Sequence, residues 1–102
     1  MKDLYKAFYD IAKKVPAGFV TTYGELAAQS GNIRRSRIVG AAMAVCNDDS
    51  VPCHRVVYKD GSLAENFGID GSRYQRFLLE NEGVTFTPDG RVDMSKHFWF
   101  FK

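Results

Sequence analysis

The chain has 102 residues, of which 45% are hydrophobic and 25% charged, and its formal net charge at pH 7 is +2. These values are typical of a globular protein that folds without disulfides or metal, and they predict a single domain over residues 1–102. So small a net charge does not by itself indicate a nucleic-acid partner. Two cysteines, with no signal peptide, targeting tail or long apolar run, favour a cytoplasmic protein with reduced thiols and argue against secretion or a membrane.

The first predicted helix rests on four apolar residues that recur at steps of four, three and four: Leu4, Phe8, Ile11 and Val15. Residues 16–18 contain a proline and a glycine, which end this helix. Residues 19–21 are then expected to be extended. Thr22 and Glu25 have the spacing of a capping box, and this predicts a helix through about residue 30.

A second helix is expected over residues 33–46, after a turn at residues 31–32 that contains glycine. Two short helices around such a turn form a helix-turn-helix pattern. One face of the second helix is apolar and would pack on the first helices: Val39, Ala42, Met43 and Cys46. Another face carries one long cation among small residues: Arg37, Gly40, Ala41 and Ala44.

The small-residue face of this helix needs an explanation, because glycine within a helix costs about 1 kcal/mol relative to alanine. Arg34 and Arg35 add positive charge, and no acidic residue lies between residues 31 and 46. One interpretation is a helix packed tightly on a neighbouring helix, with its arginines solvated. A nucleic-acid groove fits better, with phosphates near the arginines and Arg37 as a probe.

Cys53 and His54 set a thiol beside an imidazole, immediately before a β-forming run. A thiol becomes a good nucleophile only when a base or positive charge favours the thiolate, and His54 and Arg55 could serve. An arbitrary Cys-His pair is more often a buried apolar cysteine beside a surface histidine, so the pair alone leaves both interpretations open. No zinc site is expected, because Cys46 is not spaced as a zinc ligand and His97 is distant.

The polar loop at residues 47–50 leads from the second helix to the thiol, so that binding and chemistry would share one edge. Residues 54–63 are predicted to form a β-hairpin around a turn at residues 59–61, as the wing of the helix-turn-helix. Residues 64–71 contain two glycines and show no periodicity, which predicts a loop that borders a pocket.

A last helix is predicted to begin at Ser72, because Ser72 and Gln75 repeat the capping-box spacing, and to end at Gly83. Glu82 lies at its C-terminal end, where the helix dipole disfavours a carboxylate. The carboxylate is therefore either solvated or held by a partner such as a histidine. The aromatic residues at 98–101 are expected to pack back on the core.

Four motifs resemble, in order and spacing, the C-terminal domain of O6-alkylguanine-DNA alkyltransferases (methylated-DNA–protein-cysteine methyltransferases) and of alkyltransferase-like proteins: residues 15–27, 36–43, 52–57 and 78–83. The resemblance covers nearly the whole chain. It implies a mainly α fold with a small β-hairpin, a winged helix-turn-helix of the three-helical-bundle type. It also implies binding to the minor groove of double-stranded DNA that contains O6-alkylguanine, as a monomer and without a cofactor.

The resemblance also implies roles for individual residues. Tyr23 would displace a phosphate and donate a proton to the leaving guanine, while Arg37 would fill the space of the extruded nucleotide. Cys53 would accept the alkyl group once, with His54 and Glu82 removing its proton through a water, and Asn47 would brace the hinge before the active-site turn. The DNA-binding residues are predicted to be Tyr23, Arg34, Arg35, Arg37, Gly40, Ala41 and Ala44.

Three functions follow from these features. Cys53 favours a single-turnover methyltransferase that flips out and repairs O6-methylguanine. The alternative is a non-catalytic sensor that binds O6-alkylguanine and recruits other repair proteins. The chain's size and the tail at residues 90–94 resemble that alkyltransferase-like branch, in which tryptophan typically replaces this cysteine. A plain winged-helix regulator would leave Cys53, His54 and Glu82 unexplained.

Overall fold

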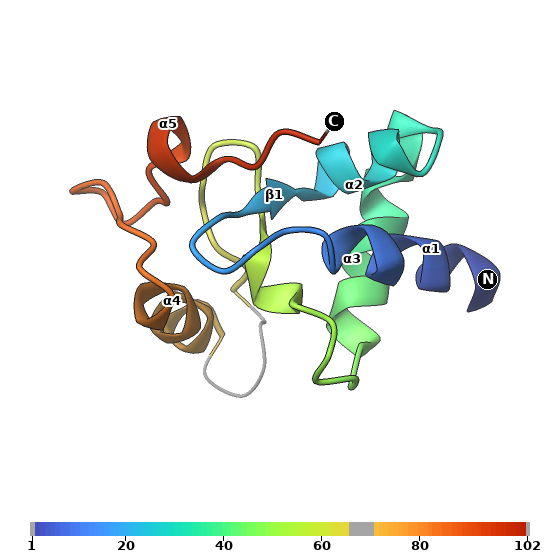
Figure 1. Cartoon of the computed structure of the whole chain (residues 1–102), viewed down its shortest axis with the longest axis horizontal. Coiled ribbons are helices and arrows are strands. Elements are labelled where there is room, and N and C mark those ends of the chain that lie inside the picture. The colour runs from blue at the N-terminus through green and yellow to red at the C-terminus, as the bar shows by residue number, and fades with distance from the viewer. Residues whose placement is uncertain (1, 66–70, 102) are drawn as a thin grey trace.

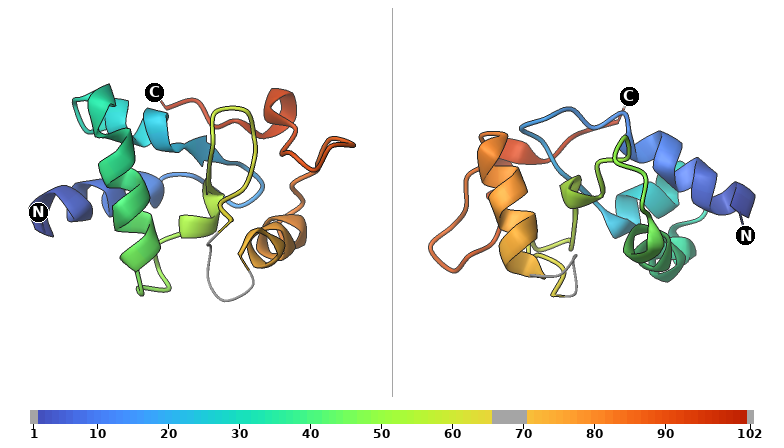
Figure 2. Two further views of the ribbon diagram at one scale, coloured as in Figure 1. Left: turned by 180° about the vertical axis from the view of Figure 1, so that it is seen from behind. Right: turned by 90° about the horizontal axis from the view of Figure 1, so that it is seen from below.

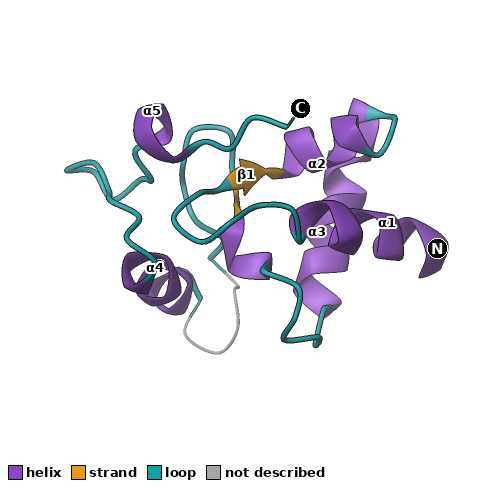
Figure 3. Cartoon of the chain, viewed as in Figure 1, coloured by secondary structure: helices purple, strands orange, loops and turns teal. Residues whose placement is uncertain are grey.

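The computed structural model describes residues 2–65 and 71–101 and is mainly helical with one small sheet, as predicted (Figure 3). In chain order its elements are α1 (Lys2–Ala12), β1 (Thr21–Thr22), α2 (Tyr23–Gln29), the 3₁₀ helix η1 (Ile33–Arg35), α3 (Ser36–Val45), the 3₁₀ helix η2 (Cys53–Arg55), β2 (Val56–Val57), α4 (Ser72–Asn81) and α5 (Met94–His97). Helices α1 to α3 lie on one side of β1, and α4 and α5 lie on the other (Figures 1 and 2). None of the described helices is long and apolar enough to span a bilayer.

Two buried clusters lie on the two sides of the sheet. The larger cluster joins α1, α2 and α3: Phe8, Ala12, Leu26, Ala27, Val39, Ala42, Met43, Val51 and Val56. The smaller cluster lies beside α4: Val20, Val57, Leu79, Val84 and Val92. Successive side chains of a strand point to opposite faces, so Val56 enters one cluster and Val57 the other. Strand β2 therefore fixes the preceding turn, η2, between two cores.

The predicted helix-turn-helix is present, but its second helix begins with a 3₁₀ turn that was not expected. The Thr22 hydroxyl oxygen accepts a hydrogen bond from the Glu25 N–H at 3.0 Å, which confirms this N-cap. The predicted helix over residues 33–46 opens with the 3₁₀ turn η1, because the Asn32 side chain accepts from the Arg34 N–H at 3.0 Å. Cys46 is extended and lies just beyond α3.

The prediction of a β-hairpin over residues 54–63 is wrong. Val56–Val57 pairs in parallel with Thr21–Thr22, from the distant segment before α2. Of the hairpin only a tight turn forms, in which the Tyr58 N–H donates to the Ser62 carbonyl at 3.0 Å. The parallel pairing buries all four strand residues, whereas a hairpin would pair the valines with a short, polar return segment.

The capping box predicted at the start of the last helix is also wrong. Ser72 is the first residue of α4, and the cap position is occupied by Gly71, which has no side chain to cap the helix. Gln75 is fully buried, because its side-chain amide forms hydrogen bonds with the Ala64 N–H and the Val56 carbonyl in the interior. Residues 66–70 of the predicted loop lie outside the described part of the chain.

The C-terminal tail packs back on the core, as predicted, except at Phe100, which is 73% exposed, and it adds the short helix α5. The Val20 N–H donates to the His97 carbonyl, and the Trp99 N–H donates to the Val20 carbonyl, both at 2.8 Å. Phe101 packs against the larger cluster. Helix α1 ends at Ala12, before Val15, but the Val15 side chain is still fully buried.

Candidate functional site

A cleft with a volume of about 1070 Å³ lies between the exposed face of α3, the η2 turn and α4. Most of the predicted site residues line it: Tyr23, Arg37, Gly40, Ala41, Ala44, Asn47, Cys53 and His54. Glu82, Arg34 and Arg35 lie outside this lining. The small-residue face of α3 and the candidate nucleophile therefore share one cavity, as the order of their motifs suggested.

Cys53 is placed at the cleft by a tight turn. Pro52, buried and without an N–H, precedes it, and the Cys53 N–H donates to the Val51 carbonyl at 2.8 Å. The Arg55 N–H then donates to the Pro52 carbonyl at 3.0 Å and closes η2. The Cys53 side chain is half-buried, packed against the larger cluster on one side and facing the cleft on the other.

Burial raises the pKa of the Cys53 thiol to about 12, and contact with the Cys46 thiol is the next cause. The thiol is therefore protonated at neutral pH, and a nucleophilic role requires a base. Cys46 packs on the larger cluster, as its predicted core face requires, but it also lines the cleft. Its contact with Cys53 was not predicted.

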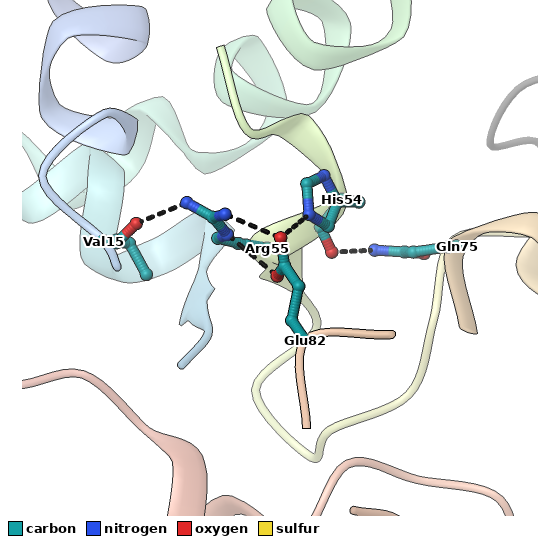
Figure 4. Close-up of polar contacts among 5 residues, drawn as sticks. All are labelled: Val15, His54, Arg55, Gln75 and Glu82. Carbon is teal, nitrogen blue, oxygen red and sulfur yellow. Dashed lines mark hydrogen bonds and ion pairs between the residues drawn. The ribbon is translucent and has the colours of Figure 1, made fainter. Parts of the chain in front are cut away.

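His54 and Arg55 converge on the Glu82 carboxylate at the end of α4 (Figure 4). His54 Nε2 lies 2.9 Å from Glu82 Oε2. Arg55 Nε donates to Oε1 at 3.0 Å, and Nη2 donates to Oε2 at 2.6 Å. Arg55 Nη1 also donates to the Val15 carbonyl at 2.8 Å. The side chains of His54, Arg55 and Glu82 are only 17–18% exposed, so water screens these contacts weakly.

These contacts explain the carboxylate at a helix C-terminus. Burial acts to raise the pKa of Glu82, but the hydrogen bonds from Arg55 and His54 outweigh it, and the pKa lies below its ordinary value of 4.5. Of the two interpretations open from the sequence, the structure has the second, in which a partner holds the carboxylate. The histidine was expected, whereas the bidentate arginine was not.

Gln75 ties α4 to the active-site turn. Its Nε2 donates to the His54 carbonyl at 3.1 Å and to the Val56 carbonyl at 3.0 Å. Its Oε1 accepts from the Ala64 N–H at 2.9 Å. Sequence reasoning missed this role, although a signal exists: Gln75 is four residues before Leu79 and so is a polar residue on the apolar face of its helix.

Tyr23, the first residue of α2, lines the cleft. Burial raises the pKa of Tyr23 to about 12, with Tyr58 and then Cys53 as further causes. The phenol therefore keeps its proton and is available as a donor. Its ring contacts that of Tyr58, with the two centroids 5.0 Å apart.

Three residues of the predicted DNA-binding face are exposed along α3: Arg37, Ala41 and Ala44. A Cβ added at Gly40 would meet no described atom within 4 Å, so tight helix packing does not require this glycine. Arg34 is exposed, whereas Arg35 is half-buried and its Nη1 donates to the Ser30 carbonyl at 3.2 Å. Within residues 2–65 and 71–101, nothing therefore fills the space beside Gly40.

A helix-turn-helix presents small residues and an arginine beside a cleft that is lined by a thiol and by an imidazole bound to a carboxylate. This combination defines a DNA-binding domain of the alkyltransferase class. Residues 3–84 match the family described as 6-O-methylguanine DNA methyltransferase, DNA binding domain, and the chain belongs to this family. The family comprises alkyltransferase and alkyltransferase-like proteins of DNA repair.

Relatives of more than one kind resemble the chain. Alkyltransferase-like protein 1 of Schizosaccharomyces pombe is 32% identical over 104 residues, which cover 97% of this chain and 96% of the relative. The bifunctional methyltransferase/endonuclease of Picrophilus torridus is 36% identical over 93% of this chain, but the chain spans only 31% of that relative. The DNA base-flipping protein of Escherichia coli is 35% identical over 89% of this chain and 70% of its own length.

Two crystal structures with DNA share the fold. S. pombe Atl1 in complex with damaged DNA containing O6-carboxymethylguanine has a TM-score of 0.85 at 32% identity, with 98% of this chain and 97% of that chain covered. Mycobacterium tuberculosis OGT in complex with DNA has a TM-score of 0.72 at 34% identity, with 79% of this chain and 49% of that chain covered.

Proposed function

We propose that this protein binds double-stranded DNA containing O6-alkylguanine in the minor groove, flips out the damaged base and transfers the alkyl group irreversibly to Cys53. The observation that carries the proposal is that Cys53 faces the same cleft as the small-residue face of α3 and His54, which contacts Glu82. The S. pombe complex with DNA containing O6-carboxymethylguanine supports the class of lesion, and the M. tuberculosis complex supports DNA as the partner. The protein acts as a cytoplasmic monomer without a cofactor.

Binding precedes the chemistry and depends on α3. The exposed Arg34 meets a phosphate, and Arg35 does so only with the part of its guanidinium that does not hold Ser30. The small residues of α3 let the groove approach the helix backbone, and Arg37 fills the stack that the extruded base leaves. Extrusion costs a few kcal/mol, which these contacts offset. Asn47, exposed at the cleft, braces the segment between α3 and η2.

Transfer needs one proton removed and one supplied. His54, oriented by Glu82, accepts the Cys53 thiol proton through a water, and the sulfur attacks the alkyl carbon. The carbon–O6 bond breaks, its electron pair stays on the guanine, and the Tyr23 phenol donates a proton to the leaving base. The proton on His54 returns to Tyr23 through solvent, so the products are guanine and a thioether. The thioether has no route back to a thiol, which limits each molecule to one turnover.

The second candidate is a non-catalytic sensor that binds the same lesion and recruits other repair proteins. Two features favour it: the alkyltransferase-like relative matches this chain over nearly its full length, and burial raises the pKa of the Cys53 thiol, which disfavours the thiolate. In a sensor, Cys53 would be part of the pocket wall.

Intact-protein mass spectrometry separates the two functions. The protein is incubated with a duplex carrying one O6-methylguanine, and the undamaged duplex serves as the control. A gain of one methyl group, mapped to Cys53 and absent in Cys53→Ser, supports transfer. Preferential binding of the damaged duplex with no gain in mass supports the sensor. Methylation mapped to Cys46 would contradict the assignment of the acceptor.

A further inference from the structure

Tyr58 lies at the rim of the cleft, immediately after β2, and has no part in the reaction described above. Its ring packs on that of Tyr23 at 5.0 Å between centroids and an interplanar angle of 48°. Tyr58 is 48% exposed, whereas Tyr23 is half-buried. Tyr58 therefore lies on the solvent side of the pair and shields Tyr23 from water.

The backbone of Tyr58 is held in place by a turn that the C-terminal segment anchors. The Gly61 N–H donates to the Tyr58 carbonyl at 2.8 Å, and the Val92 N–H donates to the Gly61 carbonyl at 2.9 Å. A Cβ at Gly61 would lie 2.6 Å from the Val92 carbonyl oxygen, and the φ of +88° also favours glycine. An aromatic ring half in water gains little from burial, so folding alone does not account for a tyrosine here.

We propose that Tyr58 is a positioning residue for Tyr23, whose ring it holds in one orientation over the cleft so that the phenol can donate to the alkylated base. The identity of that base rests on the proposed function. Beyond the effect of its buried area, a tilted aromatic pair shifts the equilibrium toward the paired conformation about two- to tenfold. Without the Tyr58 ring, the Tyr23 side chain would be freer to rotate and would meet more water.

The electrostatics of the cleft agree with this geometry. The titratable groups that face Tyr23 are Tyr58, from the turn after β2, and Cys53, from η2, and both act in the same direction as burial. Removal of the Tyr58 ring admits water to the phenol and takes away one of these groups. Both changes lower the pKa of Tyr23.

The test compares Tyr58→Ala with Tyr58→Phe, which keeps the ring, and with Phe100→Ala. Phe100 is another exposed aromatic, 73% exposed, and is not among the residues that line the cleft. The first measurement is an NMR titration of the free protein with ¹³C at the tyrosine Cζ, with Tyr23 assigned from Tyr23→Phe. We expect Tyr23 to titrate at lower pH in Tyr58→Ala and close to the wild-type position in the other two variants.

The second measurement is the ratio of affinities for a duplex with one O6-methylguanine and for the same duplex undamaged. We expect this ratio to fall about two- to tenfold in Tyr58→Ala, to recover in Tyr58→Phe and to be unchanged in Phe100→Ala. Urea unfolding midpoints show whether the variants remain folded. If Tyr58→Ala is unstable, Tyr58→Leu, which keeps an apolar side chain, is titrated in its place.

An unchanged Tyr23 titration in Tyr58→Ala would overturn the proposal, whatever happens to DNA binding. So would an equal loss of lesion preference in Tyr58→Ala and Tyr58→Phe, because the hydroxyl and not the ring would then be responsible. A wild-type protein with no preference for the lesion would contradict the proposed function. The titration would still decide whether Tyr58 holds Tyr23.

Discussion

In the free protein, alkylation of Cys53 by iodoacetamide should rise about tenfold per pH unit between about pH 7 and pH 10, without a plateau. The pKa of Cys53 is about 12, against 9.0 for an ordinary thiol. At pH 8 the thiolate fraction is then roughly one in ten thousand, compared with about one in ten for an ordinary thiol. The folded protein should therefore hold about a thousandfold less thiolate at this position than the unfolded chain.

Peptide mapping by mass spectrometry follows Cys53 separately from Cys46 at each pH. The same protein in urea is the control, because its Cys53 should react as an ordinary thiol whose rate levels off above about pH 9. The slope against pH is the decisive quantity, since restricted access to a half-buried thiol lowers the rate equally at every pH. Cys46→Ala removes the second cause of the raised pKa and should increase the Cys53 rate.

A plateau near pH 8 in the folded protein would refute this reasoning, because it would show that a neighbouring group stabilises the thiolate in the absence of DNA. Methyl transfer from a lesion-containing duplex should have a much shallower pH dependence than alkylation by iodoacetamide. In the proposed reaction, His54 removes the proton as the thiol reacts. Equal slopes in the two reactions would mean that no base assists Cys53.

Glu82→Gln should lower the free energy of unfolding in urea by about 1–3 kcal/mol, because Arg55 then lacks its counter-ion at a site only 18% exposed. Because the folded pKa of Glu82 is depressed, its ionised carboxylate contributes fully to the free energy of unfolding above pH 4.5, and this contribution is lost as pH falls through the lower folded pKa. The unfolding midpoint of Glu82→Gln should therefore lack this part of the dependence on acid pH. Gln75→Leu should cost about 1–3 kcal/mol in the same assay, since three backbone groups lose their partner; no loss would show that water replaces the amide. Arg37→Ala should slow transfer from duplex DNA far more than transfer from free O6-benzylguanine, whereas equal losses would assign Arg37 to the pocket. Arg34→Ala should weaken binding to all DNA alike and reduce the slope of log affinity against log salt by about one.

The helix-turn-helix could be predicted from the sequence because its signals are local. The Thr22 cap acts three residues away, and the turn before α3 is marked by its own glycine and asparagine. The sheet could not be predicted in the same way. Each strand has only two residues, and the pairing joins segments 35 residues apart, such as Thr21 with Val56. Nothing in the alternation of residues 54–63 distinguishes that partner from the adjacent return segment.

In the candidate site, too, contacts between neighbouring residues could be predicted and most contacts between distant segments could not. Cys53 and His54 are neighbours in the chain, so their juxtaposition was visible in the sequence. Arg55 and Gln75 act through partners 27 and 21 residues away, and no spacing rule predicts such contacts. The position of Glu82 at a helix C-terminus was a usable signal, since the helix dipole disfavours a carboxylate there. It left open whether the carboxylate is solvated or held by a partner such as a histidine, and it did not indicate a second partner.

The second partner changes the part that Glu82 can play in the proposed relay. A carboxylate that binds Arg55 through both oxygens, with its pKa held below the ordinary value, is a poor place for a proton to rest. Glu82 can still fix the His54 ring through Nε2 and stabilise the imidazolium that forms when the thiol proton arrives. The proton therefore stops at His54, and the ring nitrogen that receives it is Nδ1, because Nε2 is already bonded to the carboxylate. Arg55, through Val15 and Glu82, connects the segment after α1 to the end of α4 across η2, so the contacts that keep Glu82 ionised also hold the histidine at the cleft.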